Sequence, residues 1–119
     1  MRKLKAALIL ASAVLALCSA MTYAQQFPAK PLRLIVPLLP GAGTDVIARV
    51  FATSFGQHLG QQVVVENKAG AATTLGANFV AKSTPDGYTM LVATTSTLAV
   101  LPTVQSTPYD TVKDLIPVA

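Results

Sequence analysis

The sequence has little of what catalytic and metal sites require. Its 119 residues include one cysteine, Cys18, one histidine, His58, and no tryptophan. A disulfide framework is excluded because a single thiol has no partner within the chain. No cysteine or histidine cluster has the spacing of metal ligands, and the five acidic residues are spread along the sequence. We therefore expect no metal site and no cofactor.

The motifs of common enzyme classes are also absent. No Gly-Lys pair is present, which excludes a phosphate-binding P-loop, and no Gly-x-Ser-x-Gly elbow places a nucleophile near His58. A lone histidine late in a helical segment is typical of a solvent-facing position. We therefore expect that the protein is not an enzyme.

The N-terminal segment has the layout of a secretory signal peptide. Three basic residues, Arg2, Lys3 and Lys5, precede an apolar run of 15 residues, 6–20. This run is shorter than the roughly 20 residues that a membrane-spanning helix needs. Small residues at Thr22 and Ala24 fit a cleavage site, which predicts a signal peptide over residues 1–24. Cleavage after residue 20 is the alternative.

Little charge remains outside this leader. Three of the nine basic residues lie within it and all five acidic residues lie beyond it, so residues 25–119 carry a net charge of +1. The remaining basic residues form no run and have no interleaved aromatics, so nucleic acid is not an expected partner. A retained N-terminal anchor and a lipid anchor at Cys18 are minor alternatives. The lipid anchor is disfavoured because Leu17, rather than a small residue, precedes the cysteine.

Beyond the leader, β-rich runs alternate with segments of helical periodicity. Strands are expected at residues 32–36, 62–66 and 88–93, and helices at 46–59, 74–82 and 94–101. Apolar residues spaced four positions apart predict buried helix faces; they are Ile47, Phe51, Phe55 and Leu59, and then Leu75 and Phe79. Thr44 is expected to cap the first helix and Gly60 to end it.

Other segments complete the prediction. Three consecutive valines in residues 62–66 indicate a strand covered on both faces. Residues 102–110 are expected to form a loop, 112–115 a helical turn and 116–118 a last strand. The order strand, helix, strand, helix, strand is typical of βαβ units on a parallel sheet. The sequence therefore predicts an α/β fold, and its end at Ala119, where a strand is expected to begin, indicates an interrupted protein.

Three strand-to-helix junctions are rich in small and hydroxyl residues. They span residues 41–45, 70–74 and 94–97, and they should meet at the carboxyl ends of the parallel strands, where open α/β sheets bind ligands. A helix N-terminus has unpaired N–H groups and partial positive charge, which favours a carboxylate or phosphate. The simpler interpretation is structural, because small residues are common wherever a strand turns sharply into a helix.

A dinucleotide-binding domain is a distant alternative. Gly41 and Gly43 follow a strand, and Glu66 ends the next strand at roughly the spacing of a ribose-binding acid. The third glycine of that fingerprint is replaced by Val46, and two prolines, Pro37 and Pro40, interrupt the strand end.

Several blocks in order resemble one family. The blocks include Phe27-Pro-Ala-Lys-Pro-Leu-Arg-Leu-Ile-Val-Pro37, Pro40-Gly-Ala-Gly-Thr-Asp45, Leu59-Gly-Gln-Gln-Val-Val-Val-Glu-Asn67, Pro85-Asp-Gly-Tyr-Thr89 and Thr94-Thr-Ser-Thr97. The sequence resembles the substrate-binding proteins of tripartite tricarboxylate transporters, also called Bug receptors. The resemblance covers essentially all of residues 27–119.

The resemblance implies a periplasmic, two-lobed receptor of the type II periplasmic-binding-protein fold. Residues 25–119 would form the N-terminal part of its first lobe. It would capture a small carboxylated solute, through backbone amides, hydroxyls and water at strand-to-helix loops, and deliver it to the membrane components of the transporter. The implied ligand-binding residues are Gly41, Ala42, Gly43, Thr44, Asp45, Gly70, Ala71, Ala72, Thr95, Ser96 and Thr97. Asp45 is expected to organise its loop rather than contact an anion, because like charges repel.

Some positions depart from the family pattern. Ala42 replaces the middle one of three glycines, and its Cβ is expected to disfavour positive φ and narrow the approach of a ligand. Residues 72–74 replace the usual glycines and asparagine. Family members are also far longer, so we expect this chain alone to bind carboxylates weakly or not at all. A second function class stays open, a non-functional remnant of a truncated reading frame.

Overall fold

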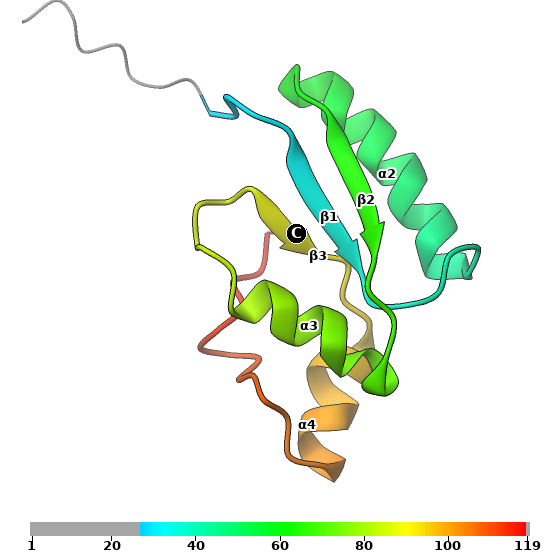
Figure 1. Cartoon of the computed structure of the whole chain (residues 1–119), viewed down its shortest axis with the longest axis vertical. Coiled ribbons are helices and arrows are strands. Elements are labelled where there is room, and N and C mark those ends of the chain that lie inside the picture. The colour runs from blue at the N-terminus through cyan, green and yellow to red at the C-terminus, as the bar shows by residue number, and fades with distance from the viewer. Residues whose placement is uncertain (1–26, 119) are drawn as a thin grey trace, which may run out of the picture.

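The computed structural model describes residues 27–118, in which three parallel strands form one sheet (Figure 1). The strands are β1 (Leu32–Val36), β2 (Val63–Asn67) and β3 (Thr89–Leu91), in the order β2-β1-β3. Leu34 lies opposite Val65 on one side and Met90 on the other. The predicted parallel α/β fold is confirmed, although β3 is shorter than predicted and β2 begins one residue later. The predicted signal peptide, residues 1–24, lies outside the described residues.

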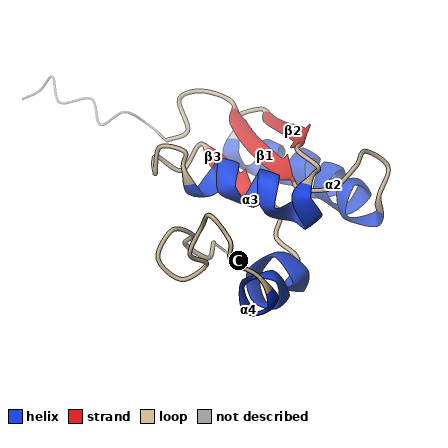
Figure 2. Ribbon diagram, turned by 60° about the horizontal axis from the view of Figure 1, so that its bottom comes forward, coloured by secondary structure: helices blue, strands red, loops and turns tan. Residues whose placement is uncertain are grey.

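Helices cover both faces of the sheet. Helix α2 (Gly43–Leu59) packs against β1 and β2, and helix α3 (Thr74–Ala81) packs against β3 and β1. Figure 2 shows the sheet between these two helices. A 3-10 turn, Ala71–Thr73, leads into α3. The predicted end of the first helix is confirmed, because Gly60 has a left-handed backbone conformation there.

The core is centred on β1 and on small residues of α2. Leu34 and Val36 are almost completely buried, and they pack against Ala48 and Ala52 of α2. Full burial of a side chain such as Leu34 contributes about 1.5–3 kcal/mol to stability. Because alanine is small, the helix axis lies close to the sheet at these positions.

The predicted buried face of α2 is wrong in the first half of the helix, whereas Phe55 and Leu59 in its second half are half-buried. Ile47 is 69% exposed and Phe51 is 47% exposed, whereas the buried positions of the helix are Asp45, Ala48 and Ala52. In α3, Leu75 is likewise 55% exposed. The apolar spacing of α2 correctly indicated a helix, but the sheet contacts a neighbouring stripe of smaller side chains.

Two local predictions also need correction. Thr44 is not the cap of α2, because the helix begins at Gly43 and Ala42 occupies the cap position without a side-chain hydrogen bond. Strand β2 is not covered on both faces. It lies at the edge of the sheet, and Val64 is 37% exposed because α3 packs over β1 and β3 instead.

The C-terminal segment differs most from prediction. A π-helical turn, Ser96–Val100, runs directly into α4 (Leu101–Val104), so the helix continues past the predicted boundary at Pro102. Because this helix is continuous from Ser96, Pro102 lies within it and has no N–H to donate to the preceding turn, where the Thr97 carbonyl accepts from the Tyr109 hydroxyl at 2.8 Å. Residues 116–118 form no strand, and Ile116 is 83% exposed. Within residues 27–118, no helix is long and apolar enough to cross a membrane.

Candidate functional site

The three predicted junctions follow the three strands and lie at one edge of the sheet. In Figure 1 the arrowheads of β1, β2 and β3 point the same way, and the chain leaves each strand toward α2, α3 and α4. We call residues 37–45 loop 1, residues 68–73 loop 2 and residues 92–97 loop 3. A hydrogen bond joins loop 2 to loop 3, and loop 1 is bonded to Asn67 at the end of β2.

Asp45 organises loop 1 from a buried position. Its carboxylate accepts hydrogen bonds from the Gly41 N–H at 2.9 Å, from Arg49 Nε at 3.0 Å and from Asn67 Nδ2 at 2.9 Å. These bonds, first that of Arg49, then those of Gly41 and Asn67, lower the pKa of Asp45 to about 2. Asp45 is 3% exposed, so its side chain serves the loop and leaves little surface for a ligand.

Asn67 connects loop 1 to the end of β2. Its Nδ2 donates to the Leu38 carbonyl at 3.1 Å as well as to Asp45, and its Oδ1 accepts from Arg49 Nη2 at 3.1 Å. Sequence reasoning did not single out Asn67. The available signal was an amide side chain at the last position of a parallel strand, which lies next to the N-terminus of the preceding helix, α2, where Asp45 is located.

The backbone of loop 1 accommodates alanine at its centre. Ala42 has a φ of −63°, so its Cβ causes no strain, and the left-handed position is Gly41 with φ +84°. The expected conflict over positive φ at Ala42 is therefore wrong. The N–H groups of Gly43 and Thr44 have no acceptor among residues 27–118, as is usual at the start of a helix.

Loop 2 has an unusual backbone. Gly70 is followed by three residues with positive φ: Ala71 at 46°, Ala72 at 52° and Thr73 at 80°. Each such residue other than glycine costs about 1–3 kcal/mol and persists only where the surrounding structure holds it, and such residues occur preferentially at functional sites. Ala71 and Ala72 are exposed, and Thr73 is buried.

A chain of hydroxyl groups joins loop 2 to loop 3. Thr97 Oγ1 donates to Thr73 Oγ1 at 3.0 Å and also hydrogen-bonds with Thr94 Oγ1 at 3.0 Å. The buried hydroxyl of Tyr109 donates to the Thr97 carbonyl at 2.8 Å. Thr97 is fully buried, whereas Thr95 and Ser96 beside it are exposed.

Helix α3 approaches these loops closely because position 76 is glycine. A Cβ on Gly76 would lie 2.8 Å from Pro37 Cβ and 2.9 Å from the Lys68 carbonyl. Sequence reasoning missed Gly76 and Tyr109 as well as Asn67, because their contacts join segments that are distant in the sequence.

The predicted site residues therefore fall into two groups. Two are buried and bonded within the protein, Asp45 and Thr97. The others are exposed or half-buried along one edge of the sheet; they are Gly41, Ala42, Gly43, Thr44, Gly70, Ala71, Ala72, Thr95 and Ser96.

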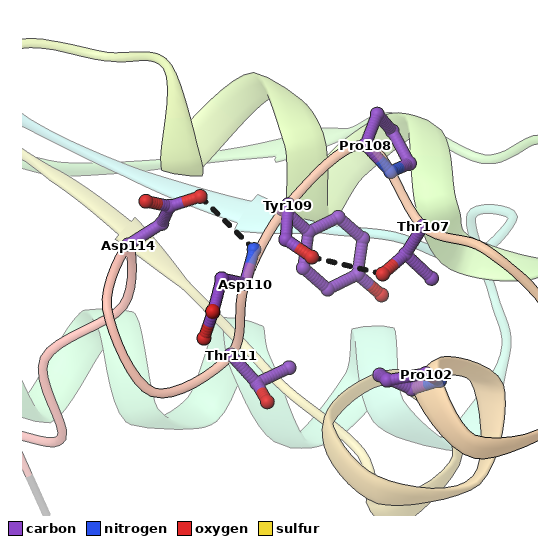
Figure 3. Close-up of a pocket in the computed structure, with 7 residues that line it drawn as sticks. All are labelled: Pro102, Thr107, Pro108, Tyr109, Asp110, Thr111 and Asp114. Atoms are coloured by element: carbon purple, nitrogen blue, oxygen red, sulfur yellow. Dashed lines mark hydrogen bonds between the residues drawn. The ribbon is translucent and has the colours of Figure 1, made fainter.

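A cavity of about 570 Å³ lies in the C-terminal segment, and it is distinct from these residues (Figure 3). Tyr109, Asp110 and Asp114 are among its lining residues, none of which is basic. The Asp114 carboxylate accepts from the Asp110 N–H at 2.9 Å. Lys113 pairs with Asp110 at 3.4 Å but does not line the cavity, so the lining offers two carboxylates and no basic side chain to attract an anionic ligand.

Two alternative sites receive little support from the geometry. Glu66, the acid of the dinucleotide hypothesis, is bonded through both oxygens to Arg33, at 2.6 Å and 2.8 Å. Arg33 lowers the pKa of Glu66 through these bonds. Across residues 27–118, no group of three or more histidine, cysteine, aspartate or glutamate side chains is placed to hold a metal ion.

A parallel α/β sheet with small-residue loops at the carboxyl ends of its strands has the architecture in which open α/β proteins bind their ligands. More particularly, the chain belongs to the family described as tripartite tricarboxylate transporter family receptor, TctC, which residues 47–119 match.

Relatives of known sequence and structure agree with this assignment. Protein BugT of Bordetella pertussis is 48% identical over 98 residues, which is 81% of this chain and 30% of BugT. A solved structure described as a periplasmic transporter is 48% identical, with a TM-score of 0.70 over 73% of this chain and 30% of its own. MatC from Rhodopseudomonas palustris, solved with bound malate, is 35% identical, with a TM-score of 0.70 over 74% of this chain and 30% of MatC. The chain spans about a third of the length of the curated relatives it matches.

Proposed function

We propose that the chain forms one wall of the solute site of a periplasmic receptor for small carboxylates. One observation carries the proposal. Three loops of exposed small and hydroxyl residues meet at the carboxyl ends of the strands, where the buried side chains of Asp45 and Thr97 hold them by hydrogen bonds. Membership in the TctC family and the malate bound to MatC support this ligand class.

In the proposed site, some residues donate hydrogen bonds to the solute and others leave room for it. The free N–H groups of Gly43 and Thr44 lie at the positive end of the α2 dipole and suit a carboxylate oxygen. The exposed hydroxyls of Thr95 and Ser96 supply further donors from loop 3. Gly70, Ala71 and Ala72 of loop 2, with Gly41 and Ala42 of loop 1, offer backbone without bulky side chains.

The proposal includes export and a transport partner. Residues 1–24 act as a signal peptide, and residues 25–119 form the N-terminal part of the first lobe. The receptor passes its solute to the membrane components of a tripartite tricarboxylate transporter. The basic start and apolar run of the leader, and the family assignment, support these steps.

Amide NMR titration with malate tests the proposed donors directly. We expect the Gly43, Thr44 and Ser96 amide signals to shift with a dissociation constant of about 1 mM or weaker, because one wall excludes little water. Malamide, the neutral diamide of malate, should produce no comparable shifts. Malate shifts elsewhere, or none at these three amides, would contradict the proposed site.

Matched serine variants separate the site from the rest of the surface. Ser96→Ala should weaken malate binding about threefold to tenfold, as expected for the loss of one solvent-exposed hydrogen bond worth about 0.5–1.5 kcal/mol. Ser106→Ala, an equally exposed change in the C-terminal loop, should leave binding unchanged. Equal effects of the two variants would argue against loop 3 as a ligand contact.

A further inference from the structure

A groove lies at the opposite edge of the sheet from the three loops. Its volume is about 690 Å³, and it is bounded by the residues before β1, by the C-terminal half of α3 and by the turn before β3. In Figure 1 this is the end of the sheet from which the strand arrows start. Its side chains of interest are Lys30, Arg33, Phe79, Lys82, Asp86 and Tyr88.

The fold gathers basic residues here that are scattered in the sequence. Arg33 Cζ lies 5.0 Å from the centre of the Phe79 ring, and Lys68 Nζ lies 4.3 Å from it. Lys30 Nζ lies 4.3 Å from the centre of the Tyr88 ring. With Lys82, the region holds four of the six basic residues of segment 25–119.

Only part of this positive charge is neutralised within the protein. Glu66 holds Arg33, and Asp86 pairs with Lys30 at 3.4 Å. The ion pairs formed among residues 27–118 include neither Lys68 nor Lys82. Lys82 is exposed on the groove wall, so its ammonium group is available to an incoming carboxylate.

The geometry favours an extended, multiply charged partner over a single small anion. The basic groups come from three separate segments: residues 30–33 and Lys82, which line the groove, and Lys68, which reaches it over the Phe79 ring. The groove is far larger than one carboxylate, and Arg33 is already bonded to both oxygens of Glu66. Phe79 and Tyr88 add apolar ring surface between the charges. Interfaces with this pattern match positive groups to negative ones and gain specificity from the match.

We propose that this groove docks an acidic peptide segment of a partner protein. Carboxylates of the segment pair with Lys82 and Lys68, and its backbone passes over Phe79 toward Lys30. The residues that line the groove include none of the proposed solute-binding residues, so a solute and a partner can be bound at the same time.

Fluorescence polarisation with fluorescein-labelled hexaglutamate tests the proposal on the full chain. We expect saturable binding that weakens with added salt, and no binding of labelled hexaglutamine. Lys82→Glu should weaken hexaglutamate binding about tenfold, and Lys82→Gln about threefold. Lys113→Glu changes the net charge equally at an exposed residue that does not line the groove, and it should change binding less than about twofold.

Several outcomes would overturn the proposal. They are equal weakening by the Lys82 and Lys113 charge reversals, absence of saturable binding, and displacement of hexaglutamate by malate, which would place the peptide at the loops instead. Binding to phosphatidylglycerol vesicles that is lost in Lys82→Glu, without binding of hexaglutamate, would assign the groove to a membrane surface. Circular dichroism of each variant confirms that it is folded.

Discussion

Replacing Ala72 with glycine should stabilise the protein, because Ala72 has a left-handed backbone conformation. Its φ of 52° and ψ of 46° fall in the region that costs a residue with a Cβ about 1–2 kcal/mol. Glycine offsets roughly 0.5–1 kcal/mol of this gain, because it increases the conformational entropy of the unfolded chain. Ala72 is exposed, so little packing is lost. The expected net gain is about 0.5–1 kcal/mol.

Thermal unfolding followed by far-UV circular dichroism measures this gain. In a protein of this size, about 1 kcal/mol corresponds to roughly 4–8 °C, so Tm should rise by about 2–8 °C. Ala81→Gly is the matched control, since Ala81 ends α3 in an ordinary helical conformation and its replacement should cost up to about 1 kcal/mol. A loss of Tm in both variants would refute the reasoning about Ala72.

The same variant tests whether the strained turn serves binding. If loop 2 is held in its binding conformation, glycine at position 72 makes the loop more flexible in the free protein. Binding of a ligand must then overcome the entropy cost of ordering the loop. Malate affinity should therefore fall while stability rises, which is the usual exchange between the two at a strained site.

Three further changes test the fold and the loops. Thr97→Val should cost about 1–3 kcal/mol in urea denaturation, because the buried Thr73 hydroxyl loses its donor, and Thr97→Ser should recover most of it. The pKa of Asp45 lies at about 2, below its ordinary 3.8, so the stabilising effect of its carboxylate is present above about pH 4 and is lost as the pH falls through about 2. Asp45→Asn should make the free energy of unfolding less dependent on pH in this range. Leu34→Ala should lower stability by about 2–5 kcal/mol and the exposed Phe51→Ala by clearly less, and comparable losses would restore Phe51 to the core.

Sequence reasoning predicted the features that depend on neighbouring residues. Runs of β-branched residues, helical spacing and Gly60 located the strands and the first helix, and their order implied a parallel sheet. A parallel sheet in turn places its strand-to-helix loops at one edge. The pairing of Asp45 with Arg49 was also predictable, because the two residues lie one helical turn apart.

The remaining features depend on tertiary contacts that local patterns do not encode. The apolar stripe of α2 at Ile47 and Phe51 indicates a helix but not which face meets the sheet; Ala48 and Ala52 face it because small side chains permit a close approach. The bonds of Asn67 to Asp45, and of Tyr109 to Thr97, join residues 22 and 12 positions apart. Local periodicity carries no signal for either.

Because the Tyr109 hydroxyl bonds to the Thr97 carbonyl, the ionisation of this side chain indicates whether the C-terminal segment is in place. Burial raises the pKa of Tyr109 above its ordinary value of 10.0, so the protonated phenol favours the folded state. That contribution is complete below pH 10 and is lost as the pH rises through the raised pKa, where a tyrosinate can no longer donate to the Thr97 carbonyl. In an alkaline titration, tyrosinate absorbance that rises only at a higher pH than that of a free tyrosine therefore indicates that the segment is packed against loop 3.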